Sequence, residues 1–160
     1  MTLLIATHAF CALTALLIGG WQLFFSVKGD RVHRLVGRLW VGLMLYVSVT
    51  SFWIRELRHG QLSLLHILSV VTFVSVILGI RDARRGNLRG HVGNMRGSWI
   101  GLCVAGMFAV GVPARAIPQF ALADPKQAVA AGLSVIVIAA VIVGTGRRLG
   151  RAPAVESAGA

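Results

Sequence analysis

Residues 8–38 read HAFCALTALLIGGWQLFFSVKGDRVHRLVGR, and residues 66–96 read HILSVVTFVSVILGIRDARRGNLRGHVGNMR. Each stretch contains a histidine, an apolar run, a basic loop and an Arg-x-His doublet, and a second apolar run follows. At an offset of 58 residues, the matching pairs are His8 with His66, Thr14 with Thr72, Arg31 with Arg89, His33 with His91, and Arg38 with Arg96. The chain therefore contains a duplicated unit, which we expect to be a helical hairpin with a histidine near each helix start.

The composition places these hairpins in a membrane. The 160 residues are 56% hydrophobic and 13% charged, and the mean hydropathy is +0.79, which is too apolar for an ordinary soluble domain. About 20 apolar residues cross a bilayer core, and five stretches come close, at roughly 2–25, 39–54, 62–80, 97–114 and 127–146. The second is short, so its helix is expected to begin earlier, near Val32. The first lacks a basic leading segment, so we expect it to stay as a helix rather than be cleaved.

These spans predict an all-α integral membrane helix bundle. Its core is expected to be four helices from two tandem hairpin repeats, with a fifth transmembrane helix outside them. The expected bounds are 1–58 and 59–116 for the two repeats, 117–147 for an outer loop and the fifth helix, and 148–160 for a disordered cytoplasmic tail.

The net charge of +11 lies mostly on one side of the predicted topology. Counted from the sequence, the loops after the first and third helices and the C-terminal tail carry +3, +4 and +2, whereas the two opposite loops carry +1 each. By the positive-inside rule, the N-terminus is outside and the C-terminus is cytoplasmic. A nucleic-acid partner is not expected, because that would need a basic groove with interleaved aromatics on a soluble fold.

The repeat predicts how the histidines pair. Each copy contains two spans, so the copies have the same orientation and are related by an axis along the membrane normal. His8 then faces His66 on the outer side, and His33 faces His91 on the inner side. Two facing imidazoles inside a helix bundle are the axial ligands that a six-coordinate b haem requires. The sequence therefore predicts two haem b groups whose iron is bound by these four histidines.

Several of these residues also have a simpler interpretation. Arg38 and Arg96 are candidates to pair with haem propionates, but for each arginine alone an interfacial anchor is the favoured interpretation. Glycines along the same helices either admit a flat macrocycle or allow close helix packing, and both interpretations stay open. His33 and His91, in basic interfacial sequence, can be simply solvated, and His59, outside the repeat, is expected to be a solvated loop residue. His8 and His66 are functional candidates by default, because ionisable groups inside spans are costly.

Other chemistry fits the sequence less well. Zinc or copper generally needs three or four protein ligands, and the only extra candidates near the pairs are Met95, Asp30 and Asp82. All five acidic residues fall in loops or the tail. Hydrolytic chemistry is therefore nearly excluded, and no catalytic residue is assigned.

The pattern resembles a known family. His8, then His33-Arg-Leu-Val-Gly-Arg38, then His66, then His91-x-x-x-Met95-Arg96 is similar to the bacterial predicted membrane proteins grouped as domain of unknown function 2306, over about residues 3–115. The resemblance implies a multi-pass protein of the bacterial cytoplasmic membrane and no particular activity. The layout also resembles that of the ascorbate-reducible di-haem cytochromes of the b type, which hold two bis-histidine haems on opposite sides of a bundle.

Together these features predict a candidate transmembrane oxidoreductase. It would move electrons through its two haems from a quinol or small reductant to an unidentified acceptor. Its partners would be the lipid bilayer, that quinone or reductant, and either a membrane partner subunit or a second copy of the chain. The alternative is a non-redox membrane protein, either a small transporter with protonatable histidines or a structural subunit of a membrane complex.

Overall fold

A computed structural model describes residues 2–54, 64–113 and 115–151, and every element within these ranges is helical. In chain order the elements are α1 (Leu3–Phe24), α2 (Arg31–Thr50), the short 3-10 helix η1 (Ser51–Trp53), α3 (Leu64–Arg84), α4 (Leu88–Gly111), α5 (Ala116–Ala123) and α6 (Pro125–Arg151). The predicted all-α class is confirmed. His59 and the predicted boundary between the two repeats lie outside the described residues.

Length and composition identify several of these helices as membrane spans. Four of them qualify alone, namely α1, α2 together with η1, α3 and α6. α4 and α5 qualify as a pair with a bend of 46° between them, which brings the total to five when the pair counts as one span. Many large apolar side chains along these helices are exposed; Ile67, for example, is 61% exposed and Val137 is 58% exposed. A lipid environment satisfies such an apolar outer surface.

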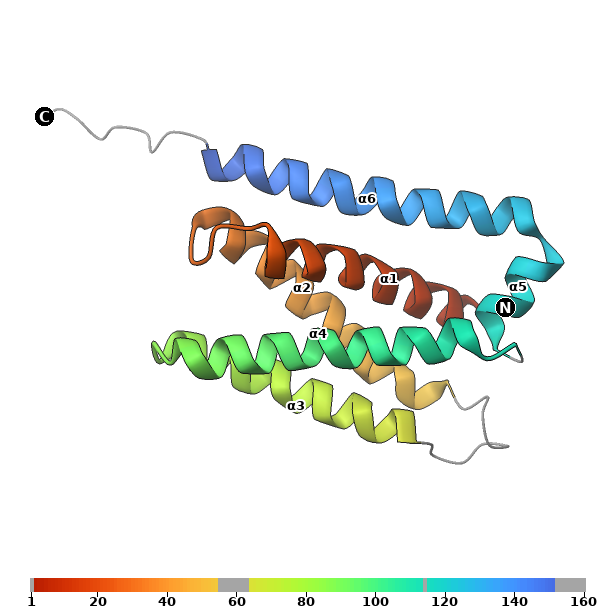
Figure 1. The fold of residues 1–160 in the computed structure, drawn as a ribbon, viewed down its shortest axis with the longest axis horizontal. Helices are drawn as coiled ribbons and strands as arrows, with labels where there is room; N and C mark the ends of the chain where they lie inside the picture. The colour runs from red at the N-terminus through yellow and green to blue at the C-terminus, as the bar shows by residue number, and fades with distance from the viewer. Residues whose placement is uncertain (1, 55–63, 114, 152–160) are drawn as a thin grey trace, which may run out of the picture.

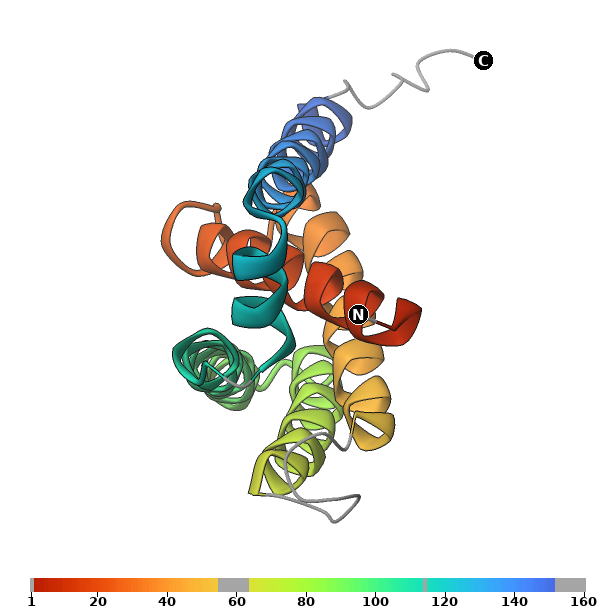
Figure 2. The same ribbon diagram turned by 90° about the vertical axis from the view of Figure 1, so that its right-hand side faces the viewer.

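The first four helices form a bundle. α1 packs against α2 and α4, and α3 packs against the same two helices. α1 and α3 therefore lie on one diagonal of the bundle, and α2 and α4 lie on the other (Figure 2). The two helices of each diagonal run in the same direction, and α6 lies on the outside against α1 and α2 (Figure 1). The predicted bundle of four core helices and one peripheral long helix is confirmed.

Two similar turns start α2 and α4. Gly29 and Gly86 adopt φ angles of +80° and +75°, a region that favours glycine because it has no Cβ. The next residue in each case caps the following helix: Asp30 accepts a hydrogen bond from the His33 backbone N–H at 2.6 Å, and Asn87 accepts one from Gly90 at 3.1 Å. This capping satisfies a backbone donor at each helix start. It also places His33 and His91 within the first turns of α2 and α4.

The two turns lie at one end of the bundle together with the C-terminal end of α6 (Figure 1). We call this the basic end. Its cationic residues are Lys28, Arg31, Arg34, Arg81, Arg84, Arg85, Arg89, Arg147 and Arg148. The short helix α5 lies at the opposite end, close to the N-terminus (Figure 1).

Two tryptophans fill the middle of the bundle. Trp40, from α2, is 5% exposed and donates its indole N–H to the Ala15 carbonyl at 2.9 Å. Trp99, from α4, donates to the Leu16 carbonyl at 3.0 Å. Both rings pack against α1 at Gly19, where a Cβ would collide with Trp40 and lie 2.7 Å from Trp99. A glycine at this position allows α2 and α4 to approach α1 from two sides.

The element bounds differ from the sequence prediction in three places. α4 begins at Leu88, ahead of the apolar run that starts near residue 97, because the Asn87 cap starts the helix although Arg89 and Arg96 lower its hydropathy; His91 lies near the helix start, as expected. The predicted outer loop contains α5, which hydropathy alone did not indicate. α6 continues to Arg151, so residues 148–151 are helical rather than part of a disordered tail, and residues 152–160 lie outside the described residues.

Candidate functional site

His33 and His91 lie together near the basic end. They come from α2 and α4, the two helices on one diagonal, and their ring centres are 6.4 Å apart with an angle of 83° between the ring planes. With an imidazole nitrogen about 2 Å from a metal and the ring centre roughly 1 Å beyond it, two axial imidazoles on one ion have centres roughly 6 Å apart. The separation of this pair is therefore compatible with one iron between the two rings.

The tautomer of His91 follows from its hydrogen bond. Its Nδ1 lies 2.9 Å from the carbonyl oxygen of Gly79 on α3. A carbonyl can only accept, so Nδ1 carries the proton and, in the neutral ring, Nε2 has the free lone pair. Metal-binding histidines generally donate the other ring N–H to a carbonyl or carboxylate in the same way.

Gln22 has the corresponding effect on His33. This glutamine is 7% exposed, and its Nε2 donates to the His33 carbonyl at 3.0 Å. Its Oε1 therefore faces the ring and accepts from His33 Nδ1 at 2.8 Å. Ser26 adds a bond to Oε1 at 2.9 Å. Nε2 of His33 is left with its lone pair, as in His91.

His8 and His66 face a common cavity. They come from α1 and α3, the helices of the other diagonal, and both line a cavity of about 650 Å³, which we call the large cavity. His66 is 6% exposed. The volume falls within the range of about 300–1,000 Å³ typical of cofactor and ligand sites.

The tautomer of His8 is also determined by its partner. Its Nδ1 lies 2.8 Å from Oγ1 of Thr50. The single hydroxyl proton of Thr50 is donated to the Tyr46 carbonyl at 2.7 Å, with a longer contact to the Val47 carbonyl at 3.3 Å. Thr50 can then only accept from His8, so Nδ1 is the donor and Nε2 has the lone pair. His8, His33 and His91 thus share one tautomer.

Small and apolar residues make up most of the wall of the large cavity. α4 contributes Gly101, Ala105, Gly106 and Ala109, and a Cβ added at Gly106 would meet nothing within 4 Å. The polar side chains of the wall other than the histidines are Ser48, Ser51, Ser69, Thr72 and Arg115. Such a wall accommodates a flat apolar ligand while a few polar groups orient it.

The predicted pairing of Arg38 and Arg96 with haem propionates stays a prediction. Both side chains are exposed, and each follows its histidine by five residues. Five residues turn a side chain by roughly 140° around a helix with 3.6 residues per turn. Met95 packs against Gly79 on α3, where a Cβ would collide with its Cε.

A bare metal centre is not supported. Among residues 2–54, 64–113 and 115–151, no group of three or more His, Cys, Asp or Glu side chains could hold a metal ion. The site instead offers pairs of imidazoles. A metal ion bound by one such pair would need its remaining ligands from another group, such as a porphyrin.

Sequence reasoning missed Gln22, Thr50 and Arg115. Gln22 could have been suspected, because a glutamine within an apolar helix is unusual and usually has a polar partner. Thr50 and Arg115 gave no comparable signal. Threonine is common in membrane helices, and Arg115 falls in a segment that the sequence indicates as a loop.

The family comparison agrees with the resemblance seen in the sequence and extends it. The model of the family described as "Predicted membrane protein (DUF2306)" matches residues 5–145, which include most of α6 as well as the two histidine pairs. No curated protein and no solved structure matches the chain. Because the match covers most of the sequence, the chain belongs to the family of predicted membrane proteins with domain of unknown function 2306.

Proposed function

We propose that this protein binds two b haems and carries electrons across the bacterial cytoplasmic membrane. One haem would be bound by His33 and His91 near the basic end, and the other by His8 and His66 in the large cavity. The observation that carries the proposal is the inner pair: two histidines on diagonal helices, 6.4 Å apart between ring centres, each with Nδ1 hydrogen-bonded to an acceptor.

Each residue has a definite role in this proposal. An acceptor keeps the proton on Nδ1 of each of three histidines, so that Nε2 can bind iron. The acceptor is Gln22 Oε1 for His33, the Gly79 carbonyl for His91 and Thr50 Oγ1 for His8. When bound, a b haem supplies an iron that takes up and releases one electron, at a potential set by its axial ligands and surroundings. The tryptophans Trp40 and Trp99 fill the bundle between the two sites and exclude water from it.

The charge distribution supports an orientation for the proposed electron transfer. The basic end would be cytoplasmic by the positive-inside rule, which leaves the large cavity and α5 near the outer surface. A quinol or small reductant at one face would then exchange electrons with an acceptor at the other. A partner subunit or a second copy could pack on the exposed face of α6.

The test is to replace the histidines one at a time by alanine and measure the haem content of the purified protein. His33→Ala or His91→Ala should remove one haem and leave the spectrum of the other nearly unchanged, and His8→Ala or His66→Ala should remove the second. His59→Ala is the control, since His59 has no histidine counterpart at the 58-residue offset, and this variant should retain both haems. If all four repeat variants keep the wild-type haem content, the proposal is wrong and a transporter or structural subunit becomes the better interpretation.

A further inference from the structure

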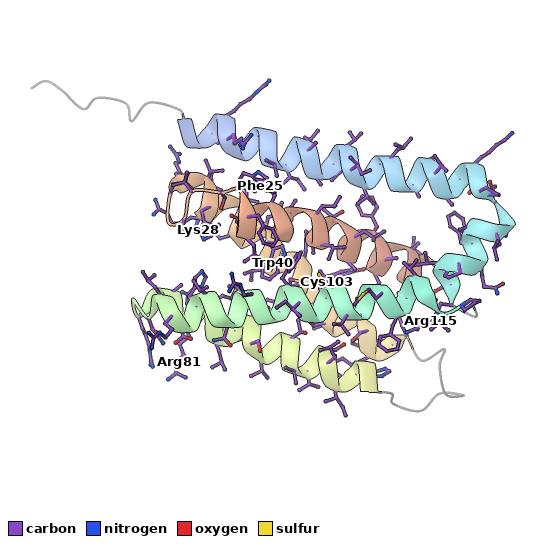
Figure 3. All side chains as sticks on the ribbon, in the orientation of Figure 1. Phe25, Lys28, Trp40, Arg81, Cys103 and Arg115 are labelled. Carbon is purple, nitrogen blue, oxygen red and sulfur yellow. The ribbon has the colours of Figure 1, made fainter. Side chains whose placement is uncertain are left out.

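Arg115 lies beside the large cavity at the junction between α4 and α5. It is the residue immediately before α5, and its backbone is extended there, with φ −83° and ψ 157°. Its side chain lines the same cavity as His8 and His66. Figure 3 labels it at the end of the bundle opposite the basic end. The arginine is therefore positioned to contact whatever the two histidines bind.

The guanidinium of Arg115 lacks a protein counter-ion in the part of the chain that the structure describes. Its Nε is buried without a hydrogen-bond partner there, and none of the described residues that line the cavity carries a carboxylate. The three described acids serve other groups: Asp30 accepts from His33, Asp82 from two asparagines, and Asp124 from Gln127. A buried polar atom without a hydrogen-bond partner is costly, so a ligand that offers an acceptor to Arg115 Nε would be stabilised at this place.

The start of α5 adds to the positive potential. Its first two residues, Ala116 and Ile117, also line the cavity. The N-terminal end of a helix carries a partial positive charge from its unpaired N–H groups. Guanidinium and helix end thus both favour a negatively charged group at this edge of the cavity.

We infer that Arg115 binds a carboxylate of the cofactor in the large cavity, namely a propionate of the haem held by His8 and His66. This inference rests on the proposed function. A haem would contact both the histidines and Arg115 in this cavity, because its iron binds imidazole and its propionates pair with guanidinium. The carboxylate edge of this haem would then face the α4–α5 junction, and a water-soluble electron donor or acceptor would approach it there.

Arg115→Gln tests this inference in the His91→Ala background, in which only the haem of the large cavity remains. Loss of a positive charge beside the haem stabilises the ferric form, so the midpoint potential should fall. We expect about a tenfold lower ratio of ferrous to ferric haem at a fixed potential, which is about 59 mV for one electron. Arg115→Lys keeps the charge, so its midpoint potential should stay close to that of the parent, the His91→Ala variant. Arg148→Gln, which changes an exposed arginine at the basic end, should leave the midpoint potential unchanged.

The outcomes separate this inference from the proposed function. If Arg115→Gln has the same haem content, potential and pH dependence of the potential as its parent, the inference is overturned while the haem assignment stands. If the parent itself binds no haem although the wild-type protein binds one, the pairing of His8 with His66 is wrong, and so is the inference. A wild-type protein without any haem overturns both proposals.

A free carboxylate-bearing reductant at Arg115 would give a different pattern. The haem potential of Arg115→Gln would then equal that of its parent, and only the KM for an anionic reductant such as ascorbate would rise. That result would also contradict the propionate assignment. A lowered potential with an unchanged KM supports it.

Discussion

Gln22→Leu should weaken the haem site near the basic end and leave the other site unchanged. Leucine has nearly the volume of glutamine, so the buried position stays filled, but three hydrogen bonds are lost. These are the bonds from Gln22 to the His33 carbonyl at 3.0 Å, from the His33 ring at 2.8 Å, and from Ser26 at 2.9 Å. Only the ring bond orients a proposed iron ligand, and loss of such a partner generally costs about 10- to 100-fold in metal affinity.

The expected loss corresponds to about 1.4–2.7 kcal/mol. Ser26 limits it, because its hydroxyl lies 3.2 Å from Nδ1 of His33 and can still accept. Haem release into an excess of a haem-scavenging apoprotein measures the effect: one of the two release phases should accelerate about 10- to 100-fold. Gln127→Leu, an exposed position on α6, is the control. If Gln22→Leu releases both haems at wild-type rates, or if only the haem of the large cavity is affected, the tautomer argument for His33 is wrong.

Three further predictions follow from the packing and the charge distribution. Gly106→Phe should fill the large cavity and abolish the haem bound there, which a measurement of haem content would show. The control Gly132→Phe, at an exposed position of α6, should retain both haems. Equal haem content in the two variants would refute the cavity assignment. Gly19→Ala should lower the free energy of unfolding by roughly 1–3 kcal/mol, because the added Cβ would meet two rigid tryptophans. In the same unfolding assay, Gly20→Ala should lower the free energy of unfolding by less, because its Cβ would lie 3.4 Å from Trp99. Reporter fusions in segments 26–34 and 82–90 and after Arg148 should be cytoplasmic, and one after Ala123 should be external; a periplasmic signal after Arg148 would contradict the proposed orientation.

The sequence was sufficient to predict the bundle and the pairing of the inner histidines. Both follow from periodicity and duplication: two like-oriented hairpins place α2 and α4 on one diagonal, and the shared register places His33 and His91 at the same level near the start of these helices. The repeat also assigned His8 and His66 to one site, and both do line the large cavity.

The partners of the histidines could not be predicted in the same way. The bonds of Gln22 and Thr50 depend on the rotation of each helix about its axis and on its contact with a neighbour, which the spacing of residues does not determine. Arg115 depends on the 46° bend between α4 and α5, which brings a residue of a predicted loop beside the cavity. Arg38 and Arg96 were singled out by the repeat, and helix geometry places them on another face of the helix than the histidines; their pairing with propionates stays a prediction.

The most direct test of the account is the haem-to-protein ratio of the purified wild-type protein together with its reduced-minus-oxidised visible spectrum. Protein expressed with ample haem and extracted in mild detergent should contain two low-spin, six-coordinate b haems per chain, because each histidine pair supplies both axial ligands of one iron. A colourless protein, or one in which neither histidine pair holds a stoichiometric amount of haem, would contradict the central claim.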